Sequence, residues 1–263
     1  MGEGRLTTGP TPIRGADGEI ATYSLLGCFA RHAVVAAASA VPLPDGIPPE
    51  VAALVGCAVI TGFGAVSETL EVSAGSRGAV IGTGGVGVNA IQGARVRGAA
   101  EIHAFDVSPD RIEQARRFGA TSGVDVRDED RMEALRRSAP RSGYDWTIVT
   151  VGRADAVQLG VELTRPGGTT VVVGLLPEST PVALDMLDLV TFEKRVVGSA
   201  YGTTSPQTLM PRILRLYQEG KLALDELVSD RLPLEEIDEA FARSRRADGL
   251  RPVLTIADGG SFA

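Results

Sequence analysis

The stretch from Gly78 to Asp106 reads GAVIGTGGVGVNAIQGARVRGAAEIHAFD, and it decides the fold. It opens with a short apolar run that is typical of a buried parallel strand. Three glycines follow at G-x-G-x-x-G spacing, Gly82, Gly84 and Gly87. Small and apolar residues then recur at helical spacing, and a second apolar strand ends in Asp106. Strand, glycine turn, helix, strand and acid stand in the order that a dinucleotide-binding βαβ unit requires.

Each part of this stretch has a physical role. Gly82 lets the chain turn sharply off the strand, Gly84 lets backbone approach a pyrophosphate, and Gly87 lets helix and strand pack closely. The helix points unpaired N–H groups and its positive dipole end at the phosphates. Asp106, about 20 residues further on, can accept hydrogen bonds from the adenosine ribose. The alternative, a plain turn without a ligand, is disfavoured because all the flanking parts are present.

Composition sets limits on the class of protein. The 263 residues, 44% hydrophobic and 22% charged, suit an ordinary soluble globular protein of one large or two modest domains. A net charge of −7 with scattered arginines argues against a nucleic-acid partner. The N-terminus lacks a signal-peptide pattern, and two cysteines form no disulfide framework, so we expect a cytoplasmic protein. The uncharged stretch 51–67 contains three glycines, which favours buried helices over a membrane span.

The pattern predicts an α/β fold with a doubly wound, mostly parallel sheet. The expected strands are 78–82, 101–106, 122–126, 145–151, 169–174 and 195–201, and the helices between them are 85–98, 109–118, 128–138 and 153–164. Before the sheet, we expect strands at 25–29 and 32–38, then a helix from Pro49 to about Leu70 that is broken near Cys57 or Thr61. After it, we expect helix 206–219, strand 227–230, helix 234–246 and strand 253–256.

Motifs on both sides of the glycine turn resemble the zinc-type alcohol dehydrogenases of the medium-chain dehydrogenase/reductase superfamily. The motifs are GCAVITGFG at 56–64, DVSPDR at 106–111, RPGG at 165–168, GSAYG at 198–202 and LALDEL at 222–227. The resemblance covers about residues 20–257. The segment VNAIQGA at 88–94 is similar to the nitrosoaniline-dependent subgroup, in which the nicotinamide cofactor stays tightly bound.

This resemblance implies a domain plan. Residues 1–58 would be a remnant of a GroES-like catalytic barrel, 59–201 an NAD-binding Rossmann domain, and 202–263 a segment that returns to the catalytic domain. Both termini would therefore contribute to a truncated barrel. The lobe that carries the family's other zinc ligands would be missing from this sequence.

The resemblance also implies NAD-dependent hydride transfer between a primary alcohol or aldehyde and the cofactor. Its residues would be Thr61 at the nicotinamide; Gly82, Thr83, Gly84, Gly85, Val86 and Gly87 at the pyrophosphate; Asp106 and Arg111 at the ribose; Val151 and Arg153 at the adenine; Val173, Gly174 and Leu175 at the nicotinamide; and Arg251 at a phosphate. We expect NAD over NADP, because the Asp106 carboxylate would repel a 2′-phosphate, although Arg111 is a possible mitigating charge.

By the same resemblance, Cys57 would be one of three protein ligands to a catalytic zinc. The family's other ligands, a cysteine and a His-Glu pair, have no counterpart here. Cys28 and His32 are not a substitute, because four residues of strand span about 13 Å. Zinc is thus expected for the family but not bound by this chain.

Three functions remain open at this stage: a zinc-type alcohol dehydrogenase, an NAD-binding remnant without zinc-dependent catalysis, and a zinc-independent reductase similar to the quinone reductases. The edge strand 195–201 predicts a homodimer.

Overall fold

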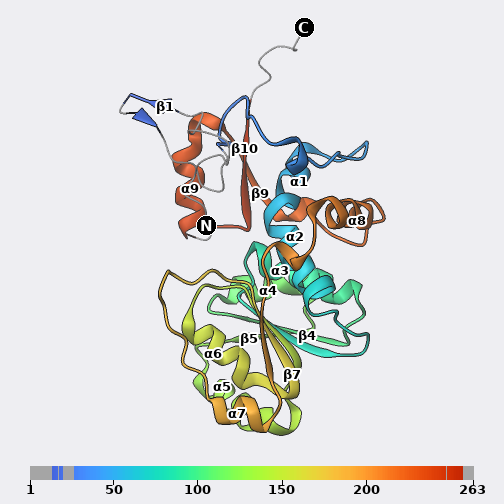
Figure 1. Cartoon of the computed structure of the whole chain (residues 1–263), viewed down its shortest axis with the longest axis vertical. Coiled ribbons are helices and arrows are strands. Elements are labelled where there is room, and N and C mark those ends of the chain that lie inside the picture. The colour runs from blue at the N-terminus through green and yellow to red at the C-terminus, as the bar shows by residue number, and fades with distance from the viewer. Residues whose placement is uncertain (1–13, 17, 20–26, 247, 257–263) are drawn as a thin grey trace. The chain divides into compact units, whose positions relative to one another are not determined.

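A six-stranded sheet with the strand order β5-β4-β3-β6-β7-β8 is the centre of the larger of two compact units (Figure 1). The structure is a computed structural model that describes residues 14–16, 18–19, 27–246 and 248–256. Its strands are β3 (Arg77–Ile81), β4 (Glu101–Asp106), β5 (Ser122–Asp125), β6 (Tyr144–Val149), β7 (Thr164–Val172) and β8 (Arg195–Gly198). Every neighbouring pair is parallel, which confirms the predicted doubly wound sheet.

Helices connect these strands on both faces of the sheet. They are α3 (Gly85–Val96), α4 (Pro109–Arg117), α5 (Glu129–Ser142), α6 (Ala154–Leu163) and the short α7 (Met186–Thr191). Right-handed crossovers put α3 and α4 on one face and α5 and α6 on the other. Side-chain caps begin three of them. Ser108 accepts from the Arg111 N–H, Asp128 from the Arg131 N–H, and Asp185 from the Leu187 N–H.

The helical run before the sheet extends from Pro49 to Thr69. It consists of α1 (Pro49–Leu54), a π turn at 55–59, α2 (Ile60–Gly64) and a second π turn at 65–69. The predicted break near Cys57 or Thr61 is wrong, because the wider π turn keeps the chain helical there. The run has 21 residues and a mean hydropathy of 1.7, enough by length and composition to cross a membrane, yet 67% of its most apolar window is buried in the fold. Burial on this scale is typical of a core helix.

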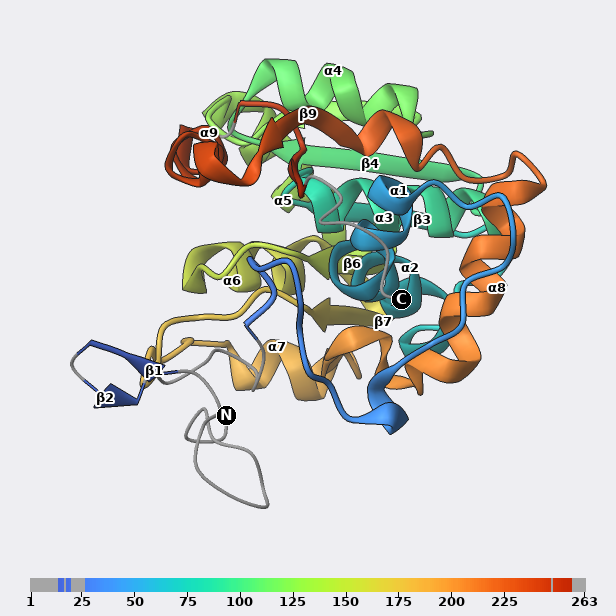
Figure 2. The ribbon, with the colours of Figure 1, turned by 90° about the horizontal axis from the view of Figure 1, so that it is seen from above.

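The larger unit comprises residues 43–227, and the smaller comprises 1–42 with 228–263. The predicted domain boundaries at 58 and 201 both fall inside the larger unit, and the domain plan itself stays a prediction. Packing joins the flanking segments to the sheet unit. A Cβ on Gly62 would overlap the carbonyl oxygen of Val86 in α3, and a Cβ on Gly64 would lie 2.9 Å from Leu209 of α8 (Pro206–Gln218). At the end of α8, Gln218 Nε2 donates to the Asp45 carbonyl at 3.0 Å, which ties in the residues before 58. Both α2 and α8 are thus packed into the sheet unit, and Figures 1 and 2 both show α8 beside the helical run.

The smaller unit contains two short sheets and a helix. Strands β1 (Arg14–Gly15) and β2 (Gly18–Glu19) pair antiparallel, β9 (Val228–Pro233) and β10 (Arg251–Thr255) pair parallel, and α9 (Ile237–Arg246) lies between the latter two in sequence. The rings of Phe29 and Phe241 meet edge to face at 5.7 Å.

The strands expected at 25–29 and 32–38 are absent from residues 27–38 of the described chain, and 25–26 lie outside it. These residues are mostly exposed, and no described strand pairs with them. The barrel remnant stays a prediction.

Candidate cofactor site

The glycine turn between β3 and α3 depends on two positions without side chains. Gly82 has φ +88°, and a Cβ there would lie 2.5 Å from Val151 Cγ1. A Cβ on Gly87 would overlap the carbonyl oxygen of Gly82 itself. Gly84 differs, because the nearest atom to its Cβ position is Arg111 Nη1 at 3.8 Å. The turn is therefore closed toward the sheet and open at Gly84, the side from which a phosphate can approach.

The N-terminus of α3 follows this opening. Gly84 is the N-cap residue and supplies no side-chain cap. The first N–H groups of a helix have no intrahelical partner, and the first turn of α3 contains no acidic residue. Free N–H groups and the positive end of the helix dipole together suit a pyrophosphate. Gly85, Val86 and Gly87 supply this first turn.

Asp106 ends β4 beside the same turn and is held by three hydrogen bonds. Its Oδ2 accepts from the Thr83 N–H at 2.8 Å and from the Thr83 hydroxyl at 3.0 Å. Its Oδ1 accepts from the Ser108 N–H at 3.1 Å. The side chain is only 6% exposed. The carboxylate therefore has a fixed orientation at the carboxyl ends of β3 and β4, where a dinucleotide ribose binds in folds of this kind.

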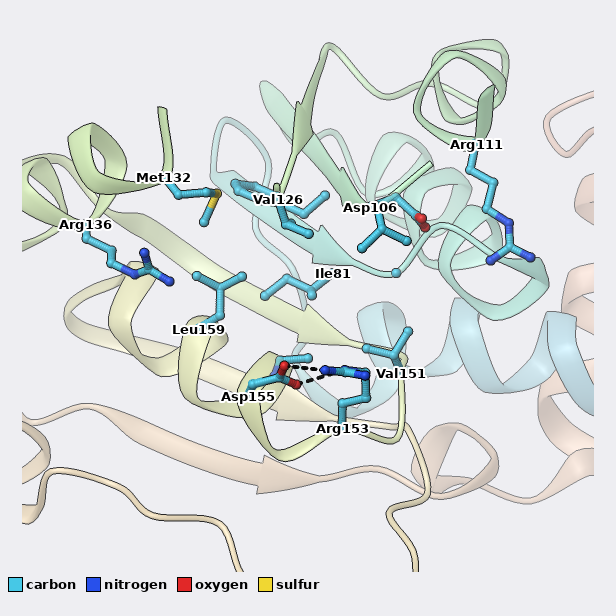
Figure 3. Close-up of a pocket in the computed structure, with 14 residues that line it drawn as sticks. Ile81, Asp106, Arg111, Val126, Met132, Arg136, Val151, Arg153, Asp155 and Leu159 are labelled. Atoms are coloured by element: carbon cyan, nitrogen blue, oxygen red, sulfur yellow. Dashed lines mark hydrogen bonds and ion pairs between the residues drawn. The ribbon is translucent and has the colours of Figure 1, made fainter. Parts of the chain in front are cut away.

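A cavity of about 440 Å³ opens at this edge of the sheet (Figure 3). Val126, Met132 and Leu159 form its apolar wall.

 
Polar groups lie at the rim of this cavity. Asp106 and Arg111 are on one side, and the Arg153–Asp155 pair is on another. An apolar interior with a few polar groups at the mouth suits a flat base attached to a ribose.

Arg153 and Asp155 form a two-point ion pair at the cavity rim. Arg153 Nε donates to Asp155 Oδ1 at 3.0 Å, and Nη2 donates to Oδ2 at 2.6 Å. These hydrogen bonds lower the pKa of Asp155 and raise the pKa of Arg153. Arg111 differs, because its guanidinium pairs with no acidic side chain among the described residues and lies beside Gly84 instead. Arg111 is therefore the cation at this rim that can still respond to a ligand.

The segments after β6 and β7 meet at the same edge of the sheet. The N–H groups of Val173 and Gly174 both donate to the Val149 carbonyl, at 2.9 and 3.1 Å. A Cβ on Gly174 would overlap the backbone of Val151, and a Cβ on Gly152 would overlap the Leu175 carbonyl oxygen. The structure therefore brings the predicted adenine-side and nicotinamide-side residues together, as backbone in direct contact.

Cys57 and Thr61 lie on the helical run that packs against α3. The contact of Gly62 with Val86 puts this run against the first turn of α3, so Thr61 is close in the fold to the glycine turn. Cys57 is an exposed free thiol. Across residues 14–16, 18–19, 27–246 and 248–256, no group of three His, Cys, Asp or Glu side chains could hold a metal ion. The described residues do not fit a catalytic zinc, and the role of Cys57 stays a prediction.

Arg251 begins β10 in the smaller unit. Its Nε is buried and has no hydrogen-bond partner within the described structure. The predicted contact of Arg251 with a cofactor phosphate stays a prediction.

Sequence reasoning missed two residues of this site. The Thr150 hydroxyl donates to the Gly82 carbonyl at 2.7 Å and fixes the turn from the neighbouring strand. Asp155 lines the cavity and orients Arg153. A polar residue directly after an apolar strand was the available signal for Thr150, because ligands bind outside the carboxyl ends of parallel strands.

Comparison with known proteins identifies the family. Residues 85–219 match the zinc-binding dehydrogenase family. The chain is 36% identical to the NDMA-dependent alcohol dehydrogenase of Amycolatopsis methanolica over 88% of its own length and 62% of that protein's length. It is 34% identical to the S-(hydroxymethyl)glutathione dehydrogenase of Saccharomyces cerevisiae, over 97% of this chain and 67% of that protein. The chain thus spans about two thirds of the length of these relatives.

Solved structures agree with this assignment. An alcohol dehydrogenase zinc-binding domain protein from Burkholderia ambifaria superposes with a TM-score of 0.89 at 31% identity, over 97% of this chain and 69% of that one. Benzyl alcohol dehydrogenase from Acinetobacter calcoaceticus gives a TM-score of 0.78, also at 31% identity, over 82% of this chain and 59% of that one. The chain therefore belongs to the zinc-binding dehydrogenase family, the zinc-type alcohol dehydrogenases of the medium-chain dehydrogenase/reductase superfamily.

Proposed function

We propose that the chain binds NAD at the carboxyl ends of β3, β4 and β6 and acts as an oxidoreductase in the cytoplasm. The substrate would be a primary alcohol or its aldehyde, as the names of the related alcohol dehydrogenases suggest. The observation that carries the proposal is the fixed, buried Asp106 carboxylate beside the open side of Gly84. When bound, NAD would supply the hydride acceptor at its nicotinamide ring.

Each part of the site would hold one part of the cofactor. The first turn of α3 would bind the pyrophosphate, Asp106 would accept from the ribose, and the apolar cavity beside Val151 would hold the adenine. Val173, Gly174 and Leu175 would border the nicotinamide, with Thr61 on the opposite helical run. Asp106 supports NAD over NADP, because a 2′-phosphate would be repelled by this carboxylate, and Arg111 at the same rim would offset only part of that repulsion.

A second candidate applies to the 263-residue chain by itself: NAD binding without zinc-assisted turnover. It is supported by the exposed Cys57 and by the lack of a three-ligand cluster among the described residues. Three ligands and an open position are what a catalytic zinc of this kind needs.

Turnover and zinc content together separate the two candidates. We expect the purified chain to bind NAD, to contain less than stoichiometric zinc by elemental analysis, and to form little NADH with a panel of primary alcohols. The control is NAD binding in the same preparation, which shows that the protein is folded. Stoichiometric zinc with rapid alcohol oxidation would reject the second candidate in favour of the complete dehydrogenase.

We further propose a homodimer through β8. All four residues of β8 are exposed, and Val196 and Val197 are among them. The preceding helix α7 exposes Met186, Leu187 and Val190. β8 pairs with β7 on one side only, and its outer edge is free among the described residues. An apolar strand with a free edge favours pairing with a second copy about a two-fold axis.

A further inference from the structure

We propose that Asn89 and Gln92 strengthen pyrophosphate binding as a relay of side-chain amides behind the first turn of α3. This inference rests on the proposed NAD binding and concerns residues that lie outside the cofactor cavity. Asn89 is 1% exposed and Gln92 is 0% exposed, and they are the two polar side chains of the segment 88–94. Each acts on the cofactor only through the turn, so both are positioning residues.

Three hydrogen bonds connect the two amides to the backbone at both ends. The Ala223 N–H donates to Gln92 Oε1 at 2.7 Å. Gln92 Nε2 donates to Asn89 Oδ1 at 3.2 Å, and Asn89 Nδ2 donates to the Gly85 carbonyl at 2.7 Å. Gly85 is the first residue of α3, and its carbonyl belongs to the same peptide group as the Val86 N–H. The relay therefore ends on a peptide group whose N–H is one of the free donors of the first turn.

The orientation of both amides follows from the backbone groups at the two ends of the relay. A backbone N–H can only donate, so Gln92 presents its oxygen to Ala223 and its NH2 group to Asn89. A backbone carbonyl can only accept, so Asn89 presents its NH2 group to Gly85. All three bonds therefore run in one direction, toward the start of α3, which is also the direction of the hydrogen bonds within the helix.

The far end of the relay is held in place by packing. Leu222 and Leu224, on either side of Ala223, are 3% and 0% exposed. Arg95 Nη2 of α3 donates to the Lys221 carbonyl at 2.6 Å. Because the two amides are buried, water cannot readily replace a lost donor, and a buried amide left unpaired is costly. The relay is therefore persistent before any ligand arrives.

The consequence is a stronger donor at the start of α3. Hydrogen bonds that run in one direction polarise one another, so the relay increases the positive partial charge on the Val86 N–H and fixes the plane of its peptide group. An N–H at this position adds to the positive end of the helix dipole, which favours an anion. The relay does not contact Asp106 or the apolar cavity, so it supports binding of the pyrophosphate and not of the adenosine.

The test measures dissociation constants by calorimetry for ADP, which contains the pyrophosphate, and for adenosine, which lacks it. Both ligands are titrated into the unmodified chain and into Gln92→Met. Methionine has the length of glutamine without its amide, so this change breaks the relay with little change in volume. We expect Gln92→Met to bind ADP about three- to tenfold more weakly and adenosine within about twofold of the unmodified chain.

A double variant tests whether Gln92 acts through Asn89. Asn89→Leu keeps the approximate shape of the side chain and removes its amide, which is the last link of the relay. We expect the loss of ADP affinity in the variant that carries both Asn89→Leu and Gln92→Met to equal the loss in Asn89→Leu alone, because a relay that is already broken cannot be broken again. A purely structural effect of each substitution would add.

Thr147→Val is the matched control for loss of a buried hydrogen bond. Thr147 on β6 is 0% exposed, and its hydroxyl donates to the Gly160 carbonyl at 3.1 Å, outside the relay. We expect this variant to be less stable in urea and to keep the ADP and adenosine affinities of the unmodified chain. Urea unfolding of all the variants shows which of them are folded.

The outcomes separate the relay from the proposed function. An unchanged ADP affinity in a folded Gln92→Met, or an equal loss of ADP and adenosine affinity, would overturn the relay while leaving NAD binding intact. Additive losses in the double variant would overturn the action of Gln92 through Asn89. Failure of the unmodified chain to bind NAD or ADP at all would overturn the proposed function itself.

Discussion

At the scale of single residues, the environment of His103 on β4 links pH to stability. Its Nδ1 lies 2.7 Å from the Tyr144 hydroxyl, and its Nε2 lies 3.4 Å from Glu101. Burial, followed by the nearby Arg77, lowers the pKa of His103, and Glu101 opposes this only in part. Burial also raises the pKa of Tyr144 to about 12, so the phenol stays protonated. The folded state therefore favours neutral His103.

This shift predicts the direction of a pH dependence. Above the unfolded pKa of about 6.5, His103 is neutral in both the folded and the unfolded chain, so its titration does not lower the free energy of unfolding. As the pH falls below that value, the unfolded chain binds the proton first, so the free energy of unfolding decreases. We expect urea unfolding to show lower stability at pH 5.5 than at pH 7.5, and His103→Gln to reduce that difference. An equal difference in His103→Gln would show that another group is responsible.

At the scale of elements, the contact of α2 with α3 depends on Gly62. A Cβ there would overlap the Val86 carbonyl and lie 2.9 Å from the Ala90 nitrogen, both of which are backbone atoms that cannot move aside alone. We expect Gly62→Ala to lower the free energy of unfolding by on the order of 1–3 kcal/mol and to weaken NAD binding by displacing the first turn of α3.

Gly56→Ala is the matched control on the same helical run. Its Cβ would meet only Met210 Cε, at 3.9 Å. Alanine is the better helix former, so stability should stay the same or rise by up to about 1 kcal/mol. Chemical denaturation of both variants compares them directly. Equal stability of Gly62→Ala and the unmodified chain would contradict the close packing of α2 on α3.

The elements that local patterns specify were predictable from the sequence. Strand 101–106 has the predicted bounds, and the glycine turn with Asp106 followed from spacing alone. The π turn at 55–59 was not predictable, because tertiary packing keeps an apolar glycine-containing segment helical. Thr150 joins the site through its hydrogen bond to Gly82, a residue distant in sequence, and Asp155 joins it because α6 helps to line the cavity. Residues 32–38 are apolar like a strand but have no described partner strand to pair with.

At the scale of the whole molecule, the proposed dimer makes a direct prediction. Val197 on β8 is 37% exposed, and a lysine there would bring like charges together across a two-fold edge. We expect the unmodified chain to sediment as a dimer at micromolar concentration and Val197→Lys to sediment as a monomer. Val34→Lys, at a position that is 87% exposed in the smaller unit, is the control and should remain a dimer. A monomeric unmodified chain would reject the proposal.

We propose that Asp106 selects NAD over NADP in the cavity at the carboxyl ends of the strands. Calorimetric titration of NAD and NADP into the unmodified chain and into Asp106→Ala tests it most directly. We expect NAD to bind more tightly than NADP, and the ratio of the two dissociation constants to fall by about tenfold or more in Asp106→Ala, because the repulsion of the 2′-phosphate is gone. Tighter binding of NADP by the unmodified chain, or a ratio that Asp106→Ala leaves unchanged, would contradict this role of Asp106.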